Sequence, residues 1–173
     1  MRVRKRPEEE TRGATGLLLR SLLLSTAIVV GYFVLPMDRV GGDSLAWLLA
    51  GLAVVAVLLV WQIREITRSP YPRLRAAGAL ATSVPLFFAV FASTYFVMES
   101  TQPGSFNESL TKLDSAYFTV TVFATVGFGD IVPVSEVARG VATVQMLGDL
   151  VIVGLVARVL FDAIQRGLSR RGE

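Results

Sequence analysis

The chain contains no cysteine and no histidine among its 173 residues. Without cysteine it can form neither a disulfide nor a thiol nucleophile, and without histidine it lacks imidazole metal ligands and the commonest general base. The sequence also holds no clustered set of acids and nucleophiles. We therefore expect neither an enzyme nor a bound cofactor.

Apolar residues, by contrast, are abundant. They make up 53% of the chain, and the mean hydropathy is +0.57, which is above the range of ordinary soluble domains. The pI of about 9.7 raises the question of nucleic acid, but the basic residues lie at the ends of apolar runs, where the positive-inside rule places them. The predicted partner is the lipid bilayer, and no nucleic acid is expected.

Two apolar runs in the first half, residues 16–35 and 45–63, are each long enough to cross a hydrocarbon core of roughly 30 Å as a helix. A signal peptide is the alternative for the first run, but no clean small-x-small cleavage site follows it. The expected division of this half is a cytoplasmic arm at 1–15, disordered over 1–12, a two-helix transmembrane hairpin at 16–66 and an arginine-rich cytoplasmic linker at 67–75.

The second half, residues 76–164, shows two more apolar runs with a shorter one between them. Thr111 and Asp114 have the spacing of a capping box, so a helix of about 12 residues is predicted to begin there and to end near Ala124. That is half a bilayer, as in a re-entrant helix. The spans are expected at 76–98, with a kink at Pro85, and at 137–161, before a cytoplasmic tail at 165–173.

Between these runs lies the hexapeptide Thr125, Val126, Gly127, Phe128, Gly129 and Asp130. A dehydrated potassium ion needs oxygens on all sides, and successive backbone carbonyls supply them densely. Gly127 and Gly129 can adopt the left-handed dihedrals that turn neighbouring carbonyls to the same side. We interpret this segment as one strand of a selectivity filter, with Val126 and Phe128 pointing outward into the surrounding packing.

From about Leu74 to Arg166 the chain resembles the pore module of the tetrameric potassium channels, with outer helix, pore helix, filter and inner helix. The resemblance implies an all-α integral membrane protein with four transmembrane helices, a re-entrant pore helix and a filter, assembled as a homotetramer in the plasma membrane with both termini in the cytoplasm. It also implies K⁺ as the permeant ion, bound at Thr125, Val126, Gly127 and Phe128.

The chain departs from that family around the filter. Related pores often pair a filter tyrosine with a pore-helix tryptophan, whereas this chain has Phe128 at the filter and Tyr117 and Phe118 in the pore helix. We therefore predict that packing supports the filter more than hydrogen bonds do. Tyr117, Phe118 and Thr121 are the predicted support residues of the pore helix. Thr121 stands where some relatives have a glutamate, so Asp130 is expected to need another partner or water.

Three residues of the last span are candidates for a cavity or gating role: Asp149, Gly148 and Gly154. A carboxylate facing lipid is costly, so we expect Asp149 to face the pore axis, where four copies ring the cavity. The alternative is a structural carboxylate bonded to a hydroxyl such as that of Thr143 or Ser93. For Gly148 a hinge and close helix packing are equally consistent with the sequence.

The leading functional hypothesis is a potassium-selective channel. The alternatives are a weakly selective cation channel and an accessory membrane subunit without a pore. The first two spans carry only Arg20 and Arg64, near their ends, which does not match the three to four gating charges of a voltage sensor. We interpret them as a packing or assembly hairpin.

Overall fold

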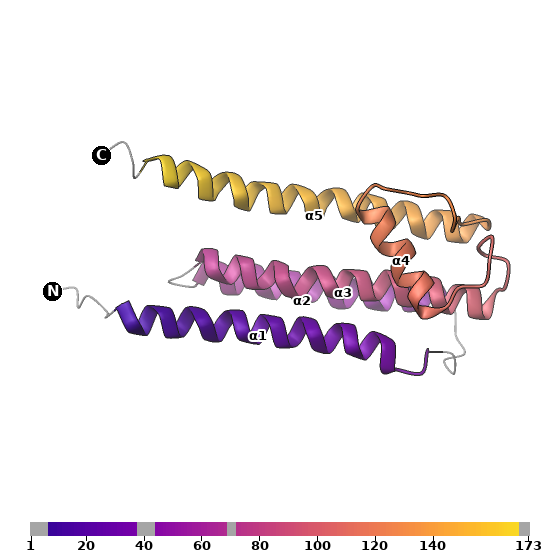
Figure 1. The fold of residues 1–173 in the computed structure, drawn as a ribbon, viewed down its shortest axis with the longest axis horizontal. Coiled ribbons are helices and arrows are strands. Elements are labelled where there is room, and N and C mark those ends of the chain that lie inside the picture. Colours follow the sequence, from indigo (N-terminus) through magenta and orange to yellow (C-terminus); the bar gives the residue numbers. More distant parts are fainter. Residues whose placement is uncertain (1–6, 38–43, 69–71, 170–173) are drawn as a thin grey trace.

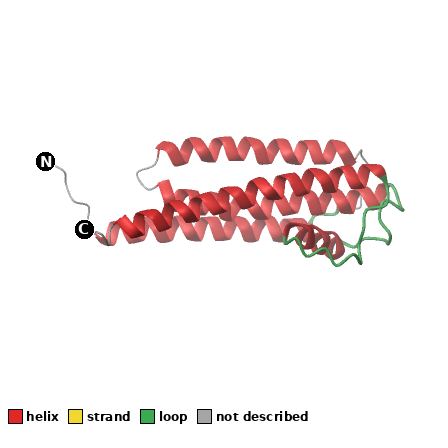
Figure 2. Ribbon diagram, turned by 90° about the horizontal axis from the view of Figure 1, so that it is seen from above, coloured by secondary structure: helices red, strands yellow, loops and turns green. Residues whose placement is uncertain are grey.

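The computed structural model describes residues 7–37, 44–68 and 72–169. Within these ranges the chain forms helices α1 (Pro7–Val34), α2 (Ser44–Arg68), α3 (Pro72–Thr101), α4 (Lys112–Phe123) and α5 (Glu136–Ser169). The four long helices run side by side, and the short α4 crosses them near one end (Figure 1). The loops on either side of α4 gather at that same end (Figure 2), opposite the end where α1 begins and α5 finishes.

The helices extend beyond the predicted spans. α1 begins at Pro7, so the disorder predicted up to residue 12 is wrong for residues 7–12. Proline suits the first helical position because its missing N–H would have no partner there. α2 continues to Arg68 and α3 begins at Pro72, so most of the predicted 67–75 linker is helical. α5 likewise continues to Ser169. Arg and Gln are good helix formers, so a helix can extend beyond the point where the hydropathy of the sequence falls.

Residues 1–6, 69–71 and 170–173, which belong to the predicted arm, linker and tail, lie outside the described residues. Among the residues that are described, two helical segments are long and apolar enough to cross a membrane, Gly78–Thr101 and Glu136–Arg158, and α1 holds a shorter apolar run, Leu19–Val34. The all-helical membrane prediction agrees with these segments. The count of four spans stays a prediction.

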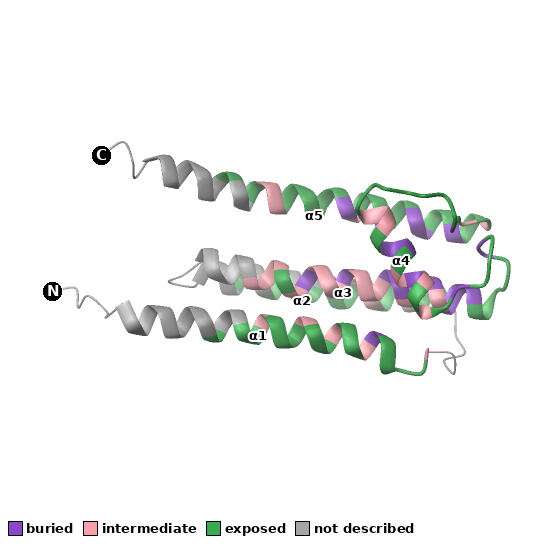
Figure 3. Ribbon diagram, viewed as in Figure 1, coloured by how far each residue is buried: buried purple, intermediate pink, exposed green. Residues whose placement is uncertain are grey.

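Most of the buried side chains lie where α3, α4 and α5 meet (Figure 3). Tyr95 of α3, Phe106 of the following loop and Phe118 of α4 form a triangle of edge-to-face rings, with centroids 5.1 to 5.6 Å apart. Each such pair contributes about 0.5–1.5 kcal/mol beyond its buried area. Through this triangle Phe118 packs α4 against α3.

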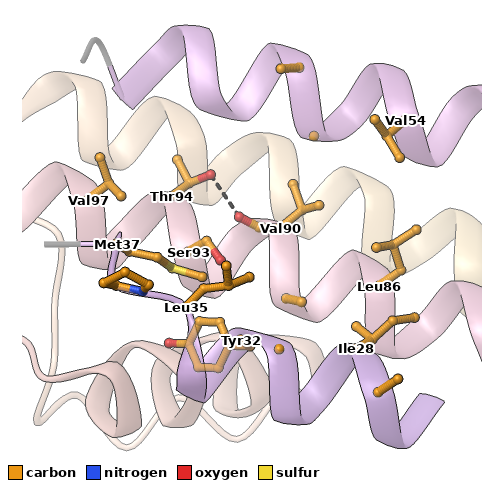
Figure 4. A pocket seen from close by; sticks show the side chains of 16 residues that line it. Ile28, Tyr32, Leu35, Met37, Val54, Leu86, Val90, Ser93, Thr94 and Val97 are labelled. Atoms are coloured by element: carbon orange, nitrogen blue, oxygen red, sulfur yellow. Dashed lines mark hydrogen bonds between the residues drawn. The ribbon is translucent and has the colours of Figure 1, made fainter. Parts of the chain in front are cut away.

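The first two helices form a layer on α3. On one side Gly51 of α2 lies so close to α3 that a Cβ atom there would be 2.6 Å from the side chain of Val90. On the other side Ser25 of α1 donates a 2.6 Å hydrogen bond to the carbonyl of Ala81. A cavity of about 630 Å³ with apolar walls, including Ile28 and Leu86, remains between the three helices (Figure 4).

Candidate pore and selectivity filter

The pore helix α4 begins at a complete capping box. The Thr111 hydroxyl accepts from the backbone N–H of Asp114 at 3.2 Å, and the Asp114 carboxylate accepts from the backbone N–H of Thr111 at 2.9 Å. These two bonds satisfy N–H groups that the first turn of a helix leaves without partners. The predicted start of this helix is confirmed, and it ends at Phe123 with Ala124 as its C-cap.

Positive φ recurs at every second residue of the filter segment. Gly127 has φ of +51° and Gly129 of +79°, as predicted for these glycines, and Thr125 has φ of +56°. Alternation of left- and right-handed residues brings successive backbone dipoles to a common side instead of reversing them as in a strand. The φ values at these three residues are those expected of a row of backbone groups that face one way.

The N–H groups at the start of the filter turn back to the pore helix. Thr125 donates to Val122 O at 2.9 Å, Val126 donates to Thr121 O at 3.0 Å, and Gly127 donates to the same Thr121 oxygen at 3.4 Å. Thr121, predicted as a support residue, thus acts through its main chain. No group in the described part of the chain donates to the carbonyls of residues 125–129, so these oxygens are free to bind a ligand.

Tyr117 holds the outer end of the filter. Its hydroxyl donates to the Asp130 carboxylate at 2.8 Å, and its ring stacks on that of Phe128 with centroids 6.3 Å apart. The hydrogen bond from Tyr117 lowers the pKa of Asp130 and raises the pKa of the tyrosine, because it favours the ionised carboxylate and the protonated phenol. One tyrosine thus supplies both a hydrogen bond and a ring contact at the filter, so hydrogen bonding acts here beside packing. The partner predicted for Asp130 is Tyr117.

The loops on either side of the filter are tied together by Asn107, which sequence reasoning missed. Its amide nitrogen donates to Asp130 O at 2.6 Å, and its amide oxygen accepts from the N–H of Val132 at 2.8 Å. The preceding loop is itself fixed by buried Glu99, whose carboxylate accepts from the N–H groups of Gly104 and Phe106 at 3.1 and 3.0 Å. Both ends of the filter are thus anchored within one chain.

Residues 83–166 match a family model described as "Ion channel". This segment is similar to ion channels. It shares 31% identity over 93 residues with the voltage-gated potassium channel Kch of Escherichia coli (strain K12), an alignment that covers 53% of this chain and 22% of that protein. No solved structure matches. The predicted resemblance to potassium channel pores is confirmed.

In this ion channel segment the inner helix α5 joins the pore helix through a buried polar network. Gln145 is fully buried; its amide oxygen accepts from the Tyr95 hydroxyl at 2.8 Å, and its nitrogen donates to Thr119 O at 2.9 Å and to the Asp149 carboxylate at 3.3 Å. A single side chain thereby links the outer, pore and inner helices. No pattern in the sequence singles out Gln145, because its partners are 26 and 50 residues away.

Asp149 lies on the packed face of α5. Its side chain is only 5% exposed, one carboxylate oxygen is bonded to Gln145, and the other is buried without a partner in the described chain. This burial argues against the predicted orientation toward a pore axis, because a side chain that lines an axis shared between copies would be exposed in a single chain. The alternative prediction, a structural carboxylate, agrees better with the observed contacts. The partner of the carboxylate is the amide of Gln145, however, and not the hydroxyl of Thr143 or Ser93.

The two gating glycines differ in their surroundings. A Cβ atom on Gly148 would lie 2.9 Å from the ring of Phe87, so this residue permits close packing of α5 on α3. A Cβ atom on Gly154, by contrast, would have no atom within 4 Å beyond its own stretch of helix. The buried residues of α5 that the structure describes end at Asp149, and Ile152 is the last that packs on the core.

Large apolar side chains of the channel segment stay exposed in a single chain. Val126 and Phe128 of the filter are 52% and 70% exposed, so in one chain they do not point into packing as predicted. The inner helix also presents Leu147 and Leu150. Exposed apolar side chains of this size need a cover that the described part of one chain does not supply.

Proposed function

We propose that four copies of this chain form a potassium-selective channel whose filter is residues 125–130. The observation that carries the proposal is the filter backbone, with positive φ at Thr125, Gly127 and Gly129 and with carbonyls that accept no hydrogen bond in the described chain. Potassium ions bind between the carbonyl oxygens of Thr125, Val126, Gly127 and Phe128, which replace their hydration shell.

The need for several copies follows from the geometry of one. A single strand places oxygens on one side of an ion, whereas a dehydrated ion must be surrounded, and four copies about an axis complete each cage. The exposed side chains of Val126 and Phe128 then pack against the neighbouring copy. The C-terminal ends of four α4 helices carry partial negative charge that favours a cation below the filter.

The chain is then a multi-pass protein of the plasma membrane. The apolar runs in α1 and α2 add two crossings to those of α3 and α5, so both termini lie on one side. The arginines at the ends of α2, α3 and α5 assign that side to the cytoplasm. Asp130 then marks the outer mouth of the filter.

The test is flux through purified protein in liposomes. We expect K⁺ to pass and Na⁺ to be largely excluded, with a reversal potential that follows the K⁺ gradient, and a detergent-solubilised assembly of four chains. Equal passage of Na⁺ would identify a weakly selective cation channel. No flux from a correctly folded assembly would instead favour an accessory subunit without a pore.

A further inference from the structure

The first residue of the pore helix is held by the first helix of the chain. The Lys112 ammonium donates to the carbonyl of Phe33 at 3.0 Å and to that of Leu35 at 2.6 Å, at the end of α1. The same ammonium lies 5.9 Å above the ring of Phe96 in α3. Lys112 therefore joins three helices at the outer end of the bundle.

In a second contact the donor is on α1 and the acceptor is on α4. The Tyr32 hydroxyl of α1 donates to the carbonyl of Lys112 at 2.5 Å. The Tyr32 side chain is 5% exposed, and its ring lines the cavity between α1, α2 and α3 while its hydroxyl points away from that cavity (Figure 4). Side chain and main chain of Lys112 are thus both bound to α1.

The chemistry of a helix end explains why these bonds form. The last carbonyls of an α-helix lack intrahelical donors and carry partial negative charge, so a nearby cation stabilises them. α1 has no basic residue in its own last turn. Lys112, 77 and 79 residues away from its two acceptors, supplies that cation, and each helix end fixes the other.

We propose that Tyr32 and Lys112 are positioning residues through which α1 fixes the pore helix, and with it the shape of the filter. α4 is a rigid element of 12 residues whose far end leads directly into Thr125, so a displacement at Lys112 moves the filter. The first hairpin is then part of the filter support and not only an assembly element. This inference rests on the proposed potassium-channel function.

The test uses the full chain reconstituted in liposomes, with Lys112→Met and Tyr32→Phe as variants. Lys112→Met keeps the aliphatic stem and removes the ammonium donors, and Tyr32→Phe removes one hydroxyl. Lys112→Arg, which keeps a cation with several donors, is the conservative rescue. Val30→Ala is the matched control, because it changes an exposed side chain of α1 that takes no part in these contacts.

Two readouts are measured: the K⁺ to Na⁺ permeability ratio, and hydrogen exchange of the α4 amides. We expect Lys112→Met to reduce the ratio and to speed exchange in the first turn of α4, each by about fivefold, with Tyr32→Phe smaller in both. The double variant should resemble Lys112→Met alone, because both residues act at one contact. Lys112→Arg and Val30→Ala should behave as the parent.

Unchanged selectivity and unchanged exchange in both variants, with a conducting parent, would overturn the inference. If Lys112→Met does not fold, Tyr32→Phe decides by the same two readouts. A parent that carries no potassium current fails the proposed function instead. In that case faster hydrogen exchange of the α4 amides in the variants would still establish that α1 holds α4. Exchange at the parent's rate would overturn the contact between α1 and α4 as well.

Discussion

A positive φ occurs at three filter residues, Thr125, Gly127 and Gly129. The conformational energy of this φ is higher for threonine than for glycine. Glycine adopts this region freely, whereas a residue with a branched Cβ pays about 1–2 kcal/mol. Thr125 keeps the conformation because its own N–H and those of the next two residues are bonded to carbonyls in the last turn of α4. The strain at Thr125 is therefore the cost of turning its carbonyl to the same side as the others.

Gly127→Ala and Gly129→Ala are expected to abolish selective potassium flux. Each adds a Cβ at a φ of +51° or +79°, at a cost of about 1–2 kcal/mol that recurs in every copy of the proposed tetramer. The measurement is flux in K⁺ and in Na⁺ gradients. Gly140→Ala is the matched control, because that helical glycine has no positive φ and its new methyl group would have no atom within 4 Å. Selective flux through either filter variant would contradict the assignment.

Tyr117→Phe should make the filter more sensitive to acid. The Tyr117 bond stabilises ionised Asp130 and lowers its pKa, so the stabilisation is present above the ordinary Asp pKa and is lost as pH falls through the lowered value. Without the hydroxyl, protonation occurs at higher pH. We expect the acid limb of a flux-against-pH curve to move upward in the variant. An unmoved curve would mean that Asp130 ionisation does not support conduction.

Asp149→Asn should leave conductance and block by internal Mg²⁺ unchanged. The side chain is buried in its own subunit, and an amide oxygen can still accept from Gln145 while the buried charge is removed. The thermal midpoint should stay the same or rise. A lower conductance at unchanged stability would restore the interpretation of a carboxylate ring in the cavity.

At the scale of elements, the filter is positioned by the contact of α3 with α4 and α5. The aromatic triangle around Tyr95 fixes α4, and Gly148 lets α5 approach the ring of Phe87. Gln145 then connects all three helices through hydrogen bonds. The inner helix is thus fixed beside the pore helix before any second copy is added.

Gly148→Ala should loosen this contact. Its new methyl group would lie 2.9 Å from the Phe87 ring, and such overpacking costs about 1–3 kcal/mol. We expect a lower thermal midpoint of the assembly, measured against Gly154→Ala, which adds the same methyl group in open space. Phe87→Leu combined with Gly148→Ala should recover part of the loss. Equal midpoints for the two single variants would argue against close packing at Gly148.

The elements that sequence reasoning found are those whose signal lies within a few residues. The capping box at Thr111 and the dihedrals of Gly127 and Gly129 follow from residue types at fixed spacing. The supports of the filter were not found in this way, because Asn107 bonds to a residue 23 positions later and Gln145 to one 26 positions earlier. Long-range hydrogen bonds leave no periodic trace in the sequence.

The predicted orientation of Asp149 differs from the observed one for a related reason. A helix reveals its buried face when apolar residues form a stripe, but α5 is apolar on several faces, with Val144, Met146, Leu147 and Leu150 exposed beside buried Val141. Its sequence therefore does not separate the packed face from a face toward lipid or the pore axis. Only the structure places Asp149 against Gln145.

At the scale of the whole molecule, the first hairpin does not have the charges of a voltage sensor. Residues 16–35 contain one charged residue, Arg20, and residues 45–63 contain none before Arg64. Three to four gating charges per subunit are needed for steep voltage dependence. We expect a shallow conductance–voltage curve in planar bilayers without blocking ions. A steep curve that disappears when α1 and α2 are removed would show that the hairpin senses voltage.

The two halves of α5 differ in how well they are packed within one chain. Its outer half is fixed to α3 and α4 as far as Ile152, whereas the described side chains beyond it, such as Leu155 and Phe161, are largely exposed in a single chain. In the proposed tetramer, contacts with other copies would hold these inner halves in place. One of them cannot move without removing the support of its neighbours, so closure at the inner end of the pore should be a concerted, cooperative event of all four chains.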